Sequence, residues 1–120
     1  MNKITHFEIP ADNMERAKSF YEQVFDWKIN KWEGSVEYWC IKMGQGKDCL
    51  SGGLMSRKQG IGKHPINTIE VISIDEFLKK IELKGGEIIT PKMTIDKIGF
   101  IAYFKDTEGN VMGILEKNKT

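Results

Sequence analysis

Apolar positions along this chain follow one pattern that occurs twice, with a shift of 60 residues. The strand-like run at residues 4–9 aligns with residues 64–69. The helical apolar positions align in the same way: Met14, Ala17 and Tyr21 with Ile74, Phe77 and Ile81. Because the spacing of apolar residues is the main sequence signal for local structure, each half is predicted to form the same strand–helix–strands unit.

The first half is predicted to begin with a strand, since residues 4–9 alternate in character. The segment from Asp12 to Glu15 has the form of a capping box, in which Asp12 accepts from exposed helix N–H groups and Glu15 reaches back. The apolar stripe that follows predicts a helix ending near Asp26. Further strands are predicted at residues 27–32, 36–43 and 49–55.

The second half repeats this order. A strand is predicted at residues 66–72, and a second capping box runs from Ser73 to Glu76. Gly85 and Gly86 are predicted to end the second helix, because glycine accepts positive φ angles. The remaining strands are predicted at residues 87–90, 99–105 and 110–116.

The predicted fold class is α+β, built from two βαβββ modules in one domain that spans residues 1–120. The first module covers about residues 1–56 and the second about residues 64–120. Residues 57–63 are polar, contain two glycines and are predicted to link the modules. A chain of 120 residues is long enough to bury a core without disulfides or metals.

Charge and composition restrict the class of partner. The net charge is +1, from 18 basic and 17 acidic side chains that are interspersed, which argues against a nucleic-acid partner. No apolar stretch is long enough for a membrane helix, and the N-terminus lacks an apolar signal core. We therefore expect a cytoplasmic protein with no membrane partner, in which Cys40 and Cys49 are reduced thiols.

Two segments carry a family likeness: the opening HFEIPADNMERAKSFYEQVFDWK and the closing YFKDTEGNVMGILE. With the doubled βαβββ pattern, they resemble the glyoxalase/bleomycin-resistance/extradiol-dioxygenase superfamily, also called vicinal oxygen chelate proteins. In detail the chain looks most like small bacterial proteins labelled "predicted enzyme related to lactoylglutathione lyase". The resemblance implies two cupped sheets around a cavity and a homodimer, in some relatives formed by exchange of halves.

The resemblance also implies a divalent metal held by one ligand from the first and last strand of each half. His6 matches the first of these positions, and its counterpart 60 residues on is Ile66. The last-strand positions fall on Gly113 in the second half and on Gly52 or Gly53 in the first. One imidazole does not provide the three or four donors that a metal needs, so we predict that the metal site is lost.

Three alternatives keep a divalent metal possible. A two-residue slip of the strand would bring His64 towards His6, and a bulge at Gly113 would turn Glu116 inward. Glu8 shares the strand face of His6 and is an additional carboxylate for a weak site. A hydrogen bond between His6 and Glu8 is the commoner outcome for such a pair.

Two function classes follow. In the first, the chain binds a small apolar or aromatic molecule in the cavity without a cofactor. In the second, it is a lyase or isomerase related to lactoylglutathione lyase, with His6 and Glu8 moving a proton next to a carbonyl, with or without a weakly held metal. An interaction domain with an empty cavity is a third reading. The predicted cavity lining is Tyr38, Trp39, Cys40, Gly52, Gly53, Thr68, Phe100, Tyr103 and Gly113.

Overall fold

The computed structural model describes residues 1–34, 37–44 and 50–119. The chain divides into two compact units. We call His6–Pro65 the first unit, and Met1–Thr5 together with Ile66–Thr120 the second unit. The described residues form two α-helices and nine strands, so the fold is α+β as predicted.

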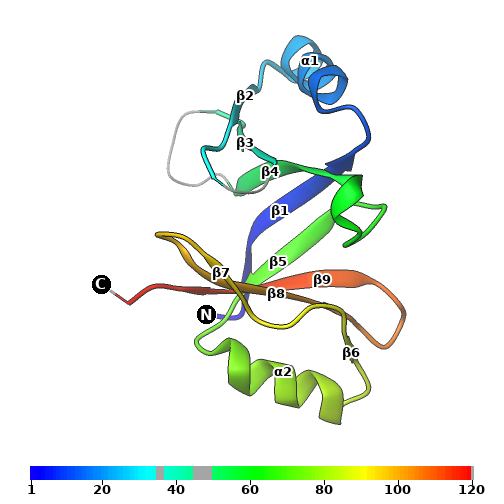
Figure 1. Cartoon of the computed structure of the whole chain (residues 1–120), viewed down its shortest axis with the longest axis vertical. Helices are drawn as coiled ribbons and strands as arrows, with labels where there is room; N and C mark the ends of the chain where they lie inside the picture. The colour runs from blue at the N-terminus through cyan, green and yellow to red at the C-terminus, as the bar shows by residue number, and fades with distance from the viewer. Residues whose placement is uncertain (35–36, 45–49, 120) are drawn as a thin grey trace. The chain divides into compact units, whose positions relative to one another are not determined.

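The first unit has the predicted order of one strand, one helix and three strands (Figure 1). Its elements are the part of β1 (Lys3–Ala11) from His6 onward, α1 (Met14–Phe25), β2 (Lys28–Lys31), β3 (Tyr38–Lys42), β4 (Ser51–Ser56) and the short 3-10 helix η1 (Arg57–Gln59). The strands are ordered β2-β3-β4-β1, with β1 parallel to β4 and the other pairs antiparallel. Two predicted strand ends, at Val36 and Cys49, lie outside the described residues.

The second unit repeats this arrangement with one additional strand. Its elements are β5 (Ile66–Glu70), α2 (Ile74–Leu83), β6 (Glu87–Ile88), β7 (Met93–Ile95), β8 (Gly99–Lys105) and β9 (Val111–Lys117). The strands are ordered β5-β9-β8-β6, and β7 also pairs with β8. The sequence did not predict β7, because three residues are too few to show a period of two.

One of the two predicted helix caps differs in the structure and the other is confirmed. Asp12 was predicted as the N-cap of α1, but the N-cap is Asn13, whose Oδ1 accepts from the backbone N–H of Arg16 at 2.9 Å. Asp12 instead bonds the guanidinium of Arg57 at 2.8 Å. The second prediction is confirmed, since Ser73 caps α2 by accepting from the N–H of Glu76 at 3.3 Å.

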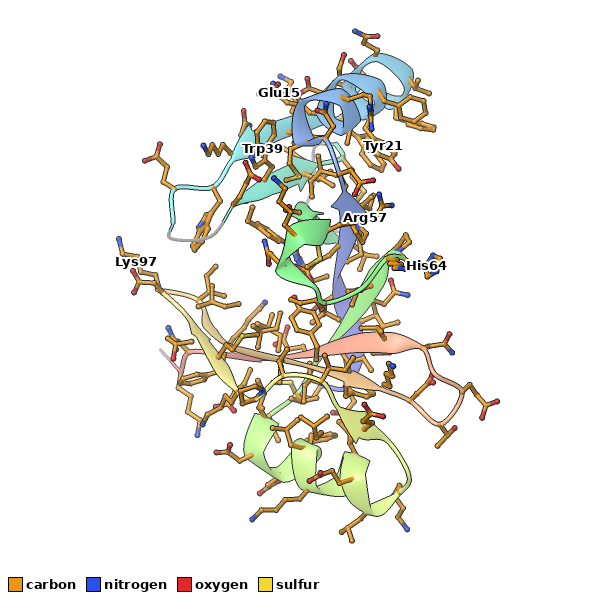
Figure 2. All side chains as sticks on the ribbon, turned by 45° about the vertical axis from the view of Figure 1, so that its right-hand side comes forward. Glu15, Tyr21, Trp39, Arg57, His64 and Lys97 are labelled. Carbon is orange, nitrogen blue, oxygen red and sulfur yellow. The ribbon has the colours of Figure 1, made fainter. Side chains whose placement is uncertain are left out.

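Each helix covers one face of its own strands. In the first unit, Met14 of α1 belongs to a core with Ile29, Trp39, Ile41 and Leu54. Trp39 lies on the side of the strands that faces α1 (Figure 2). Because side chains alternate along a strand, the residues between these positions face the other way.

The second unit has an equivalent core under α2. Its buried residues are Val71, Ile74, Ala102, Phe104 and Ile114. The helix ends as predicted, with Gly85 at a φ of 99° and the N–H of Gly86 bonded to the carbonyl of Ile81 at 2.8 Å. Neither described α-helix has the length and apolar character that crossing a membrane requires.

The turn between β8 and β9 is organised by Asp106. Its carboxylate accepts from the backbone N–H groups of Asn110 and Glu108, each at 2.9 Å. These bonds, led by that from Asn110, lower the pKa of Asp106. The turn thereby sets the register of the antiparallel β8–β9 pair, in which Tyr103 lies opposite Gly113.

The cap assignment predicts a difference between two neighbouring alanine variants. Asn13→Ala removes the acceptor for an orphan helix N–H and should lower the free energy of unfolding by about 1 kcal/mol. Asp12→Ala removes only an exposed ion pair with Arg57 and should cost less than about 0.5 kcal/mol. Urea titrations followed by circular dichroism compare the two. A larger loss for Asp12→Ala would contradict the assignment.

Candidate functional site

A hydrogen-bonded group of three side chains lies on the face of the first unit that is turned away from α1. His6 Nδ1 lies 2.7 Å from the hydroxyl of Ser51, and His6 Nε2 lies 2.6 Å from the hydroxyl of Tyr38. In a neutral imidazole one nitrogen donates and the other accepts. One of the two hydroxyls therefore donates to the ring while the other accepts from it. We call these three residues the His6 group.

Strand register explains how the His6 group forms. His6 and Ser51 are direct partners in the parallel β1–β4 ladder. Tyr38 lies on β3 opposite Met55, so its side chain must cross β4 to reach His6. Gly53 lies between these two rows, and a β-carbon there would overlap the Tyr38 hydroxyl. The missing side chain of Gly53 thus makes room for the tyrosine ring.

Burial keeps His6 neutral. The ring is half-buried, and the loss of hydration lowers the pKa of His6 from its ordinary value of 6.5. At neutral pH the imidazole therefore carries a single N–H proton, which it donates to one hydroxyl, and its other nitrogen accepts from the second hydroxyl. A neutral imidazole is the form that can accept a proton from a bound molecule.

Glu8 shares the strand face of His6 but is not its hydrogen-bond partner. Its side chain is buried, with 4% exposure, and its partners in the ladder are Gly53 of β4 and, beyond it, Cys40 of β3. The predicted bond between His6 and Glu8 is wrong, because the hydroxyls of Ser51 and Tyr38 meet the two ring nitrogens.

The structure shows on which face of the strands the predicted aromatic and glycine residues of the first unit lie. Tyr38 and Cys40 lie on the face of His6, whereas Trp39 belongs to the core under α1. Gly52 also lies on the α1 side, where the ring of Phe7 occupies the space that a β-carbon would take. Trp39 and Gly52 thus lie on the core side of the strands, and their ligand-binding roles stay predictions.

Cys40 is exposed and carries no disulfide. Desolvation of its sulfur raises the pKa of the Cys40 thiol, so the protonated thiol is the form present near neutral pH. Its ladder partner is Gly53, which places it beside the His6 group. Cys49 lies outside the described residues.

The second unit holds an equivalent row made of different residues. Thr68 pairs with Gly113 and Gly113 with Tyr103, as Glu8 pairs with Gly53 and Gly53 with Cys40. A β-carbon on Gly113 would lie 2.7 Å from Thr68 Oγ1 and 3.3 Å from the Tyr103 ring. The space beside this glycine is therefore filled by neighbouring side chains.

Thr68 and Phe100 have different surroundings in the second unit. The Thr68 side chain is fully buried, and its hydroxyl has no hydrogen-bond partner among the described residues. Such a hydroxyl is a ready partner for a polar atom of a bound molecule or a water. Phe100 packs against the core under α2, with the Lys92 ammonium 4.8 Å from its ring centre. Binding roles for both residues stay predictions.

The donor atoms near the family's metal positions are few. Within the described ranges, no three His, Cys, Asp or Glu side chains form a group that could hold a metal ion. The counterpart of His6 is the fully buried Ile66. Glu116 accepts from the first N–H of α2, at Ile74, over 2.9 Å, so its carboxylate serves as part of the helix cap.

Ser51 is the member of the His6 group that the sequence did not single out. It is separated from His6 by 45 positions and becomes its neighbour only through the parallel pairing of β1 with β4. The β5–β9 pair of the second unit has the same 45-residue register, with Thr68 opposite Gly113, but the sequence repeat does not reveal that register. The hydroxyl itself carries no motif.

A comparison with protein families finds one match over nearly the whole chain. The model of the Glyoxalase/Bleomycin resistance protein/Dioxygenase superfamily matches residues 3–114. A comparison with curated proteins finds no significant match.

Solved structures share the fold at low sequence identity. A hypothetical protein from Bacillus halodurans C-125 is 16% identical with a TM-score of 0.72, covering 98% of this chain and 96% of its own. Methylmalonyl-CoA epimerase from Mycobacterium tuberculosis is 11% identical with a TM-score of 0.70, covering 97% and 88%. A protein described as NAD-dependent benzaldehyde dehydrogenase from Legionella pneumophila is 19% identical with a TM-score of 0.66, covering 94% and 98%.

The lowered pKa of His6 predicts how stability depends on pH. The unfolded chain takes up a proton on this histidine near pH 6.5, whereas the folded chain does so only at lower pH. The free energy of unfolding should therefore fall as the pH drops below about 6.5. His6→Gln, which cannot titrate, should flatten this fall. Urea titrations between about pH 5 and about pH 7.5 measure it.

The second histidine supplies the control for this prediction. His64 lies at an exposed position, and His64→Gln is the matched substitution. An equal change in the two variants would show that His6 is not the group responsible.

Proposed function

Because the chain belongs to the Glyoxalase/Bleomycin resistance protein/Dioxygenase superfamily, we propose that it binds a small apolar or aromatic molecule beside the His6 group, without a divalent metal. The observation that carries this proposal is the engagement of both ring nitrogens of His6 by the hydroxyls of Ser51 and Tyr38. A metal needs a free lone pair on the imidazole. Here coordination would first have to displace a hydroxyl.

The residues present do not fit a divalent cation. Besides His6, the family's ligand positions carry Ile66, Gly113 and the Gly52–Gly53 pair, none of which has a side-chain donor. Glu116 is held at the start of α2. No step of the proposed function therefore runs through a metal.

The chemistry of this face suits a molecule with one polar group on an apolar body. Tyr38 offers an aromatic ring, which meets Trp32 edge to face at 6.5 Å and stacks against His6 at 6.3 Å. Aromatic rings favour flat or apolar partners. The hydroxyls of Tyr38 and Ser51 and the imidazole can exchange their mutual bonds for bonds to one carbonyl, hydroxyl or amine of the bound molecule.

A thermal-shift screen tests this proposal. Some aromatic or apolar compounds should raise the melting temperature of the protein, whereas Ni²⁺, Zn²⁺ and Mn²⁺ should leave it unchanged. Tyr38→Phe and Ser51→Ala should each reduce the shift given by such a compound, because each removes one polar contact at a cost of about 1 kcal/mol. Ser19→Ala, at an exposed position on α1, is the matched control.

Two results would overturn this prediction. A stoichiometric metal in protein purified without an affinity tag, together with a metal-dependent rise in melting temperature, would contradict metal-independent binding. A compound whose shift is the same in the Tyr38→Phe and Ser51→Ala variants as in the wild type would bind elsewhere.

A second function from a different class is favoured by the neutral state of His6. A half-buried neutral imidazole bonded to a phenol is arranged to accept a proton from carbon next to a carbonyl and to return it. The buried Glu8 carboxylate lies on the same strand face. Structural neighbours from Mycobacterium tuberculosis and Streptomyces coelicolor are methylmalonyl-CoA epimerases, which supports an isomerase in this class.

Deuterium exchange distinguishes the isomerase from the binding protein. If His6 transfers protons, the protein in D₂O should incorporate deuterium next to the carbonyl of an acyl thioester or of the methylglyoxal–glutathione adduct, detected by mass spectrometry. His6→Gln should slow this exchange at least about 100-fold. If a compound binds in a way that depends on Tyr38 and Ser51 but no deuterium is exchanged, the protein binds small molecules and is not an isomerase.

Two further expectations from the sequence stay predictions. They are the homodimer, with or without exchange of halves, and the cytoplasmic location.

A further inference from the structure

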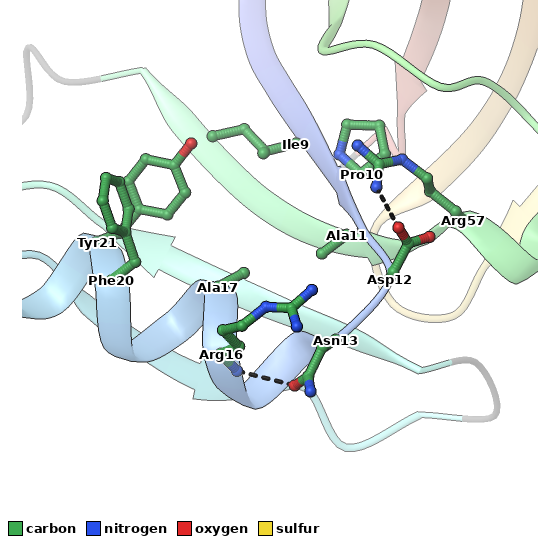
Figure 3. A pocket seen from close by; sticks show the side chains of 10 residues that line it. All are labelled: Ile9, Pro10, Ala11, Asp12, Asn13, Arg16, Ala17, Phe20, Tyr21 and Arg57. Atoms are coloured by element: carbon green, nitrogen blue, oxygen red, sulfur yellow. Dashed lines mark hydrogen bonds and ion pairs between the residues drawn. The ribbon is translucent and has the colours of Figure 1, made fainter.

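A pocket of about 360 Å³ lies on the other side of the first unit, where β1 ends, α1 begins and η1 passes (Figure 3). Its apolar wall includes Ile9, Ala17, Phe20 and Tyr21, and two arginines, Arg16 and Arg57, line it as well. Small-molecule sites have volumes from about 300 Å³ upward and combine an apolar lining with a few polar groups. This pocket has both properties.

The pocket is distinct from the His6 group. None of the residues that line it belongs to that group. Ile9 and Ala11 point to the α1 side of β1, where both contribute to the core, whereas His6 and Glu8 alternate with them on the opposite face. An inference about this pocket is therefore independent of the proposed function.

The two arginines differ in how their charges are balanced. Arg57 bonds the Asp12 carboxylate at 2.8 Å and lies 3.5 Å from the carbonyl of Lys63. The Arg16 guanidinium has no ion pair or hydrogen bond with a described residue, and the bond from Arg16 to Asn13 is made by its backbone N–H. The lining therefore carries two positive charges and one negative charge, and the open cation is Arg16.

The aromatic side of the pocket is exposed. Phe20 is 55% exposed although it is a large apolar side chain, and it meets Tyr21 edge to face at 5.1 Å. Figure 3 shows the Phe20 and Tyr21 rings on one side of the pocket and the guanidinium of Arg16 beside Ala17. An apolar body lying on these rings would remove them from water and place an attached anionic group near Arg16.

We propose that this pocket binds a small organic monoanion, with an aromatic or short aliphatic body and one carboxylate. A guanidinium matches a carboxylate with two parallel hydrogen bonds. The surplus of one positive charge suits a single negative charge, whereas Asp12 opposes a second. The body of the ligand packs against Phe20, Tyr21 and Ile9.

Amide-resolved NMR titration with 4-phenylbutyrate tests the proposal. The probe should shift the amide signals of Asn13, Arg16, Ala17 and Arg57 saturably, and its affinity should fall as ionic strength rises. The uncharged 4-phenylbutanamide, which has the same body, should bind about fivefold more weakly, because only an exposed charge contact is lost.

Two pairs of variants test the contributions of the Arg16 charge and the Phe20 ring to binding. Arg16→Gln should weaken 4-phenylbutyrate binding about fivefold, whereas Lys18→Gln removes a cation of the same helix that does not line the pocket and should have no effect. Phe20→Ala should also weaken binding, while Val24→Ala, at 56% exposure on the same helix but outside the pocket, should not. Circular dichroism confirms that each variant is folded.

Several outcomes would overturn the proposal. These are the absence of saturable shifts at the pocket, equal affinity for the acid and the amide, and equal effects of Arg16→Gln and Lys18→Gln. Shifts confined to residues around His6 would also overturn it, and they would instead support the proposed function.

Discussion

The parallel pairing of β1 with β4 is the constraint on which the first unit depends. It places His6 beside Ser51 and Glu8 beside Gly53, and it leaves Tyr38 of β3 within reach of the imidazole across a residue that has no side chain. A shift of one residue in this ladder would exchange the two faces of the strand. His6 would then lie against the helix, and the core residues would lose their contacts with α1.

The glycines of these ladders make room for neighbouring side chains. Gly53 leaves space for Tyr38, Gly52 for Phe7, and Gly113 for Thr68 and Tyr103. Their missing side chains are replaced by neighbouring side chains, so these positions remain packed. Hydroxyl groups lie beside two of these glycines, that of Tyr38 beside Gly53 and that of Thr68 beside Gly113. In the first unit the Tyr38 hydroxyl bonds His6.

The two faces of the first unit carry different chemistry because α1 covers only one of them. On the covered side, apolar packing leaves a pocket at the end of β1, where Arg16 and Arg57 supply positive charge. On the other side, polar groups meet around an imidazole that burial keeps neutral. Strand alternation separates these faces, so residues adjacent in sequence, such as Tyr38 and Trp39, serve the site and the core respectively.

Periodicity and capping residues are enough to predict the local elements. These are both helices, the glycine that ends α2, the Ser73 cap and eight of the nine described strands. These signals are short in range, so neighbouring residues suffice to read them. The three-dimensional structure was needed to show that Asn13 rather than Asp12 caps α1, and that Ser51 and Tyr38 rather than Glu8 bond His6. Those partners lie 45 and 32 positions away from His6, and they meet through strand pairing and register, which side-chain periodicity does not specify.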